Sequence, residues 1–102
     1  MYDLKNLAKL KTLGDLAPDA VKAFWGFNNA ALAGGTIPVK YKELMAVSVA
    51  LTTQCPYCIE VHVKQAREAG VTDAELAETV MVAAALRAGA AVTHGTHCFA
   101  KE

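Results

Sequence analysis

The chain has no excess of charge and no long run of one sign. Its 102 residues include ten basic and ten acidic side chains, so the formal net charge is zero. Proteins that bind nucleic acids present a basic stripe to the phosphate backbone, and no such stripe is visible in this sequence. The charge pattern therefore argues against a nucleic-acid partner.

Signals for secretion and for a membrane span are also missing from the sequence. No charged segment precedes an apolar one at the N-terminus. The longest uninterrupted apolar stretch, Val80–Leu86, ends at Arg87, far short of the ~20 residues that a bilayer requires. We therefore expect a soluble, cytoplasmic protein without a membrane partner. In that reducing compartment, three cysteines do not indicate a structural disulfide framework.

The sequence shows little that is typical of β-structure. No segment alternates apolar and polar residues for long enough to predict a strand, and neither Asn-Gly nor Asp-Gly occurs. Every segment has helical spacing instead. The predicted fold class is all-α, and the length fits a single domain, residues 1–102, of five to six helices.

Proline, glycine and a capping motif divide the chain into its expected helices. The expected segments are Asp3–Leu13 ended by Gly14 and Asp15, Pro18 to Gly34-Gly35, Pro38 to Gln54, Cys55 to Gly70, a helix that opens on a capping box at Thr72–Glu75 and bends or breaks at Gly89, and Ala90–Ala100.

The apolar content is higher than one small domain can bury. Hydrophobic residues make up 54% of the chain, against roughly 45–50% in typical soluble domains. A domain of this size has little interior, and the run Leu44–Leu51 and Trp25 both need to be covered. We therefore expect part of the apolar surface to be buried between subunits of a homo-oligomer.

The motif with the clearest chemistry is Cys55-Pro56-Tyr57-Cys58, followed by His62. With Cys55 at the N-cap, both sulfurs lie over the first turn of a helix, where the positive end of the dipole stabilises a thiolate. His62 lies four residues after Cys58, on the same helix face, and an imidazole there can take or return the thiol proton. This arrangement predicts an activated thiol.

Glu43 is the candidate partner of this group. The helix that carries it is apolar nearly all round, so its carboxylate is expected to be enclosed and to need a partner or a raised pKa. The alternative is a carboxylate exposed in the first helical turn, near Lys40 and Lys42.

The spacing of Glu43, Cys55, Cys58 and His62 resembles the signature of the alkyl hydroperoxidase D-like (AhpD-like) family, within the carboxymuconolactone decarboxylase superfamily. The resemblance implies a hydroperoxide-reducing enzyme in which Cys58 attacks the peroxide and Cys55 closes a disulfide. It also implies a proton relay of His62 and Glu43, no cofactor, a dithiol or lipoyl-type reductant, and trimers or hexamers. The namesake enzyme has a histidine where this chain has Tyr57. The decarboxylase branch lacks the cysteine pair, so the pair argues against that chemistry.

Two questions remain open from the residues alone. Capping by itself favours Cys55, rather than Cys58, as the thiol of lower pKa, because an N-cap sulfur accepts amide hydrogen bonds. The segment with His94, His97 and Cys98 could join the two motif cysteines in a zinc site. The protein would then be a metal-stabilised helical binding module without catalysis. A third reading is an interaction platform that does not need Cys58.

Overall fold

The computed structural model describes residues 2–99, and this part of the chain is helical with no strand. The all-α prediction is confirmed. In chain order the elements are η1 (Leu4–Lys9), α1 (Leu10–Leu16), α2 (Pro18–Leu32), α3 (Val39–Thr53), α4 (Pro56–Glu68), α5 (Asp73–His94) and η2 (Gly95–Cys98), where η marks a 3-10 helix.

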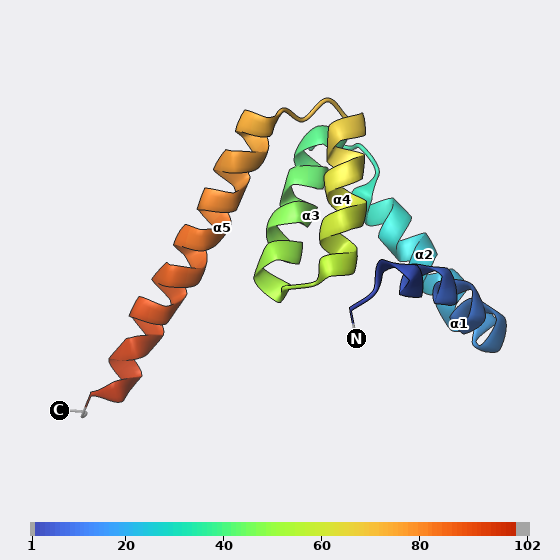
Figure 1. Ribbon diagram of the computed structural model, residues 1–102, viewed down its shortest axis with the longest axis horizontal. Coiled ribbons are helices and arrows are strands. Elements are labelled where there is room, and N and C mark those ends of the chain that lie inside the picture. The colour runs from blue at the N-terminus through green and yellow to red at the C-terminus, as the bar shows by residue number, and fades with distance from the viewer. Residues whose placement is uncertain (1, 100–102) are drawn as a thin grey trace.

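The antiparallel pair of α3 and α4 forms the centre of the fold (Figure 1). α3 is apolar nearly all round because α4 packs against one of its sides and α5 against another. The buried cluster consists of Val47 from α3, Ala66 from α4 and Val71 from the loop that follows. This small core holds the two helices that carry the candidate site residues.

The N-terminal helices form an arm on one side of this pair. α1 and α2 pack against each other, η1 contacts α4, and α2 contacts α3. The Lys42 ammonium donates hydrogen bonds to the carbonyl oxygens of Ala31 and Ala33, at 2.9 and 2.6 Å, where α2 ends. A basic side chain at a helix C-terminus satisfies carbonyls that have no intrahelical partner. Lys42 thereby fixes the end of α2 against α3.

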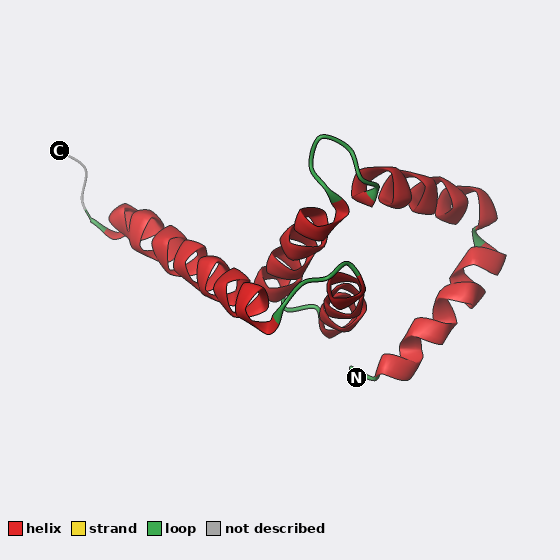
Figure 2. Cartoon of the chain, turned by 90° about the horizontal axis from the view of Figure 1, so that it is seen from above, coloured by secondary structure: helices red, strands yellow, loops and turns green. Residues whose placement is uncertain are grey.

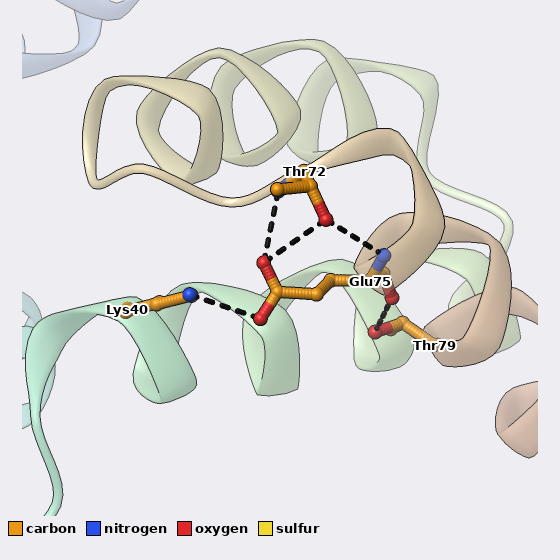
Figure 3. A network of polar contacts seen from close by, with 4 residues as sticks. All are labelled: Lys40, Thr72, Glu75 and Thr79. Atoms are coloured by element: carbon orange, nitrogen blue, oxygen red, sulfur yellow. Dashed lines mark hydrogen bonds and ion pairs between the residues drawn. The ribbon is translucent and has the colours of Figure 1, made fainter.

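The junction of α4 and α5 follows the predicted capping box. Gly70 takes a φ of 90°, a conformation that favours glycine, just past the end of α4. Thr72 Oγ1 accepts the Glu75 amide at 3.2 Å, and the Glu75 carboxylate accepts the Thr72 amide at 2.9 Å. Lys40 of α3 reaches the same carboxylate at 2.9 Å (Figure 3). The cap therefore also attaches the first turn of α5 to α3.

Three expected boundaries were wrong. The first segment is not one helix ending at Leu13, because η1 passes into α1 at Leu10 and the helix continues through Gly14 and Asp15. Gly89 does not interrupt α5, which continues to His94. A single glycine lowers the stability of a long helix by only about 1 kcal/mol. The last expected segment is the end of α5 followed by η2, and its final residue, Ala100, lies outside the described residues.

α5 leaves most of its surface uncovered, and Figures 1 and 2 show it running away from the other helices. The radius of gyration is 17.2 Å, against about 13 Å for a compact chain of 100 residues. By length and composition the segment Asp73–Cys98 would suffice to cross a membrane, and 6% of its most apolar window is buried. The core helix of a soluble protein passes the same test, so one such helix is weak support for a span.

Candidate active site

The two motif cysteines lie in a tight turn between α3 and α4. Gln54 ends α3 in the left-handed conformation, with a φ of 57°. The Cys55 amide then donates to the carbonyl oxygen of Ala50 at 3.1 Å, which holds the turn against the last turn of α3. Cys55 is the N-cap of α4 and Pro56 is its first residue, as predicted. The local sequence therefore determines the position of both sulfurs.

The sulfurs of Cys55 and Cys58 face each other as free thiols. The two Sγ atoms lie 2.8 Å apart, within hydrogen-bond distance, and the Cys58 amide donates to Cys55 Sγ across 3.3 Å. A disulfide bond would measure about 2.05 Å. No disulfide bond joins the pair, and the two side chains already point at one another.

This contact separates the pKa values of the two thiols. The pKa of Cys55 lies below the ordinary 9.0, because the Cys58 thiol and the Cys58 amide both donate to its sulfur. The same thiol contact, together with desolvation and the charge on Cys55, raises the pKa of Cys58 to about 11. Cys55 therefore ionises first, as capping indicated, and Cys58 keeps its proton.

The candidate relay is in place across the α3–α4 interface. Glu43 is buried, with 4% of its surface exposed, and its Oε2 lies 2.9 Å from Nδ1 of half-buried His62. Enclosure of Glu43 was predicted and is confirmed, whereas the exposed first-turn alternative is wrong. With Nδ1 held by the carboxylate, Nε2 is the ring nitrogen left to exchange a proton.

All four candidate residues line one cavity of about 700 Å³. Cys58 and His62 also line a second cavity on the α3 side, and Cys55 does not. Cys58 is exposed, whereas Cys55 is half-buried. Of the two residues, Cys58 is thus the more exposed one and the one that shares both cavities with the imidazole.

Sequence reasoning missed the outer wall of the larger cavity. The wall comes from the N-terminal arm and the outer face of α4, and its apolar members are Leu7, Leu10, Phe24, Trp25, Leu32 and Val61. The available signal was Trp25, an aromatic residue for which the sequence offered no core.

The zinc alternative finds no site within the described residues. His94 and His97 lie near each other at the end of α5, with ring centroids 5.7 Å apart, but no group of three or more His, Cys, Asp or Glu side chains there could hold a metal ion. α5 packs on α3, so its C-terminal end does not fold back onto the dithiol turn (Figure 1).

Comparison with known proteins identifies the family. The model of the carboxymuconolactone decarboxylase family matches residues 18–101, most of the chain. The chain belongs to the carboxymuconolactone decarboxylase family. It therefore shares its fold with a group that includes decarboxylases and alkyl hydroperoxide reductases and whose members are typically soluble.

Individual members of the family agree with this assignment. An uncharacterised protein of the cox locus of Paracoccus denitrificans is 45% identical over 76% of this chain and 70% of its own length. An alkyl hydroperoxide reductase of Mycobacterium tuberculosis is 34% identical over 81% of this chain, but this chain spans only 22% of that protein. The crystal structure of an apo family member from Legionella pneumophila superposes with a TM-score of 0.77, at 29% identity, over 80% of this chain and 73% of that one.

Proposed function

We propose that this protein is a thiol-dependent redox enzyme, an alkylhydroperoxidase-like peroxidase that reduces hydroperoxides through the Cys55–Cys58 dithiol. The observation that carries the proposal is the convergence of the dithiol and the Glu43–His62 pair on one cavity. A nucleophile, a base and a group that orients the base are the three parts of an activated nucleophile. The likeness to an alkyl hydroperoxide reductase adds support.

In this proposal Cys58 attacks and His62 moves its proton. Because the pKa of Cys58 is about 11, His62 must accept the thiol proton before the sulfur can react. The Cys58 thiolate then attacks the terminal peroxide oxygen, the O–O bond breaks, and the departing alkoxide takes the proton back from His62. The products of this step are an alcohol and a sulfenic acid on Cys58.

Cys55 completes the turnover. Its thiolate, already favoured by two hydrogen bonds, attacks the Cys58 sulfur and expels hydroxide, which solvent protonates to water. The net reaction converts one hydroperoxide and two thiols into an alcohol, a water molecule and a disulfide. A dithiol or lipoyl-type reductant, with two thiols of its own, then restores the pair by exchange.

Mass spectrometry of the thiols tests the order of these steps. One equivalent of cumene hydroperoxide should convert the wild-type protein to a Cys55–Cys58 disulfide. Cys55→Ser should stop at a Cys58 sulfenic acid, one oxygen heavier, and Cys58→Ser should give neither product. Sulfenic acid on Cys55 in the Cys58→Ser variant would reverse the roles of the two sulfurs. If the wild-type dithiol does not react with the peroxide, the peroxidase proposal is wrong.

We also propose that the chain is one domain, residues 1–102, that works in the cytoplasm as a homo-oligomer, a trimer or a hexamer. The proposal of a homo-oligomer rests on α5, which exposes the apolar side chains of Val80, Met81, Val82 and Leu86. Only 6% of the most apolar window of the segment Asp73–Cys98 is buried. Other copies of the chain would cover this face, with no need for a membrane or nucleic acid. A reducing cytoplasm would keep the two thiols ready for reaction.

A further inference from the structure

Tyr57, the residue between Pro56 and the second cysteine, joins the dithiol turn to the N-terminal arm. The Asn6 side-chain amide donates to the Tyr57 hydroxyl at 3.0 Å, across 51 positions of sequence. The ring of Tyr2 packs edge-on against the Tyr57 ring, with centroids 5.9 Å apart. These two contacts hold η1 against the turn that carries Cys55 and Cys58.

This link completes one wall of the large cavity. Asn6 and Leu7 of η1 line the cavity together with Tyr57, and the aromatic pair Phe24 and Trp25 of α2 lines it as well. η1 packs on α4 as well as on α1, and the Asn6–Tyr57 hydrogen bond is one of the contacts that Tyr57 makes with the N-terminal arm. A shift of η1 away from Tyr57 would remove this wall of the cavity.

The lining also determines what kind of ligand the cavity accepts. Among the described residues that line it, Glu43 is the one with a carboxyl group, and that group is bonded to His62. No lysine or arginine lines the cavity in the described part of the chain, so an anionic group would find neither of these partners there. Aliphatic and aromatic side chains beside a few amides favour an uncharged, bulky, apolar group.

We propose that the Asn6–Tyr57 hydrogen bond is a latch that determines specificity: it holds η1 over the dithiol and so favours oxidants with a bulky uncharged group over hydrogen peroxide. The proposal rests on the proposed function in naming an oxidant. Tyr57 acts here as a positioning residue, because it holds the wall and does not itself react.

The test compares two oxidants in matched variants. Tyr57→Phe keeps the ring but removes the hydroxyl, Asn6→Ala removes the donor, and Tyr41→Phe removes a hydroxyl on α3 that does not line the cavity. The readout is the ratio of the second-order rate constants for dithiol oxidation by cumene hydroperoxide and by hydrogen peroxide. We expect this ratio to fall by roughly three- to tenfold in Tyr57→Phe and in Asn6→Ala, the range that one hydrogen bond supplies. The double variant should match either single one, and Tyr41→Phe should leave the ratio unchanged.

A binding measurement separates this proposal from the proposed function. Cumyl alcohol cannot oxidise a thiol, and Trp25, the single tryptophan, lines the cavity and reports its binding by fluorescence. If cumyl alcohol binds the wild type, and binds Tyr57→Phe more weakly by roughly the same three- to tenfold, the latch is supported even if no peroxide reacts. If peroxides oxidise the dithiol but the ratio of rate constants is unchanged in folded Tyr57→Phe or Asn6→Ala, the latch proposal is wrong and the proposed function stands. Equal slowing with both oxidants would also overturn it, since that indicates general damage.

Discussion

At the scale of single residues, the site is a set of neighbouring side chains that can hold or transfer a proton. Glu43 holds one nitrogen of His62, and Cys58 shares its proton with Cys55. Each contact favours one protonation state of its partner. The thiol that is easier to ionise is that of Cys55, so the Cys58 thiol, whose pKa is about 11, has to be deprotonated by a neighbour before it can attack.

The pKa of Cys55 should depend on the donor at position 58. Cys58→Ser keeps a hydroxyl donor and the backbone amide, so Cys55 should still ionise below pH 9.0, and its thiolate is lost as the pH falls through that lowered value. Cys58→Ala keeps only the amide, so the pKa of Cys55 should rise relative to Cys58→Ser. The rate of alkylation by iodoacetamide, followed against pH, measures both values. Identical curves for the two variants would show that the side-chain contact does not set the pKa.

The relay should control how fast Cys58 reacts. His62→Ala removes the base beside a thiol whose pKa is about 11, so oxidation by peroxide should slow by roughly 10²–10⁴-fold. The pH profile should move to higher pH, where solvent can ionise Cys58. Glu43→Gln should give a smaller shift in the same direction, because the imidazole keeps a hydrogen-bond partner but loses the carboxylate. Stopped-flow oxidation from pH 6 to 10 checks both variants, and profiles that match the wild type would reject the relay.

At the scale of elements, short caps determine where each helix begins and how it meets its neighbour. Cys55 caps α4 and Thr72 caps α5. The Glu75 carboxylate joins the second cap to α3 through Lys40. The pKa of Glu75 is lowered, first by the Thr72 amide and then by Lys40. The contribution of the Glu75 carboxylate to the cap is therefore fully present above the ordinary value of 4.5 and is lost as the pH falls through the lowered one.

Removal of the cap at α5 should lower stability. Thr72→Ala deletes the hydroxyl that accepts the Glu75 amide, so the free energy of unfolding should fall by about 1 kcal/mol. Thr72→Ser keeps the hydroxyl and serves as the control, with little change expected. Urea denaturation followed by circular dichroism measures the difference. Equal stability of the two variants would show that the Thr72 hydroxyl does not stabilise the junction.

At the scale of the whole molecule, one chain is too open to bury its own apolar residues. Its longest dimension is 55 Å, and within the described residues five apolar side chains count as buried. Met81 and Leu86 of α5 are each 66% exposed. An uncovered apolar face of this length indicates a partner surface, and a second copy of the chain is the occupant we propose.

A charge on α5 should therefore break the assembly. Met81→Glu would place a carboxylate in the proposed interface, where burial without a partner is costly, so the oligomer should dissociate or lose affinity by several orders of magnitude. Met81→Leu keeps the face apolar and should assemble normally. Sedimentation velocity over a range of protein concentrations, without detergent, makes the comparison. A monomeric wild type, or one that requires lipid vesicles to stay in solution, would contradict the homo-oligomer.

Much of the fold was predictable because its signals are local. Pro56, Gly70 and the Thr72–Glu75 box each act within a few residues, so the sequence located the starts of α4 and α5. Gly89 was misjudged because one glycine costs a long helix only about 1 kcal/mol, which the rest of α5 offsets. The grouping of Glu43 with Cys55, Cys58 and His62 was predicted from the resemblance to the AhpD-like family, because spacing within one helix does not place a residue of α3 beside one of α4.

The sequence by itself determined an all-helical chain with a dithiol at a helix N-terminus and an imidazole one turn further along, because helical periodicity and capping depend on neighbours in the chain. Tertiary structure alone decided that η1 and α2 wall the cavity, that Tyr57 bonds Asn6, and that α5 lies uncovered. These features join residues far apart in sequence through packing, and no local pattern records which distant surface a helix will meet.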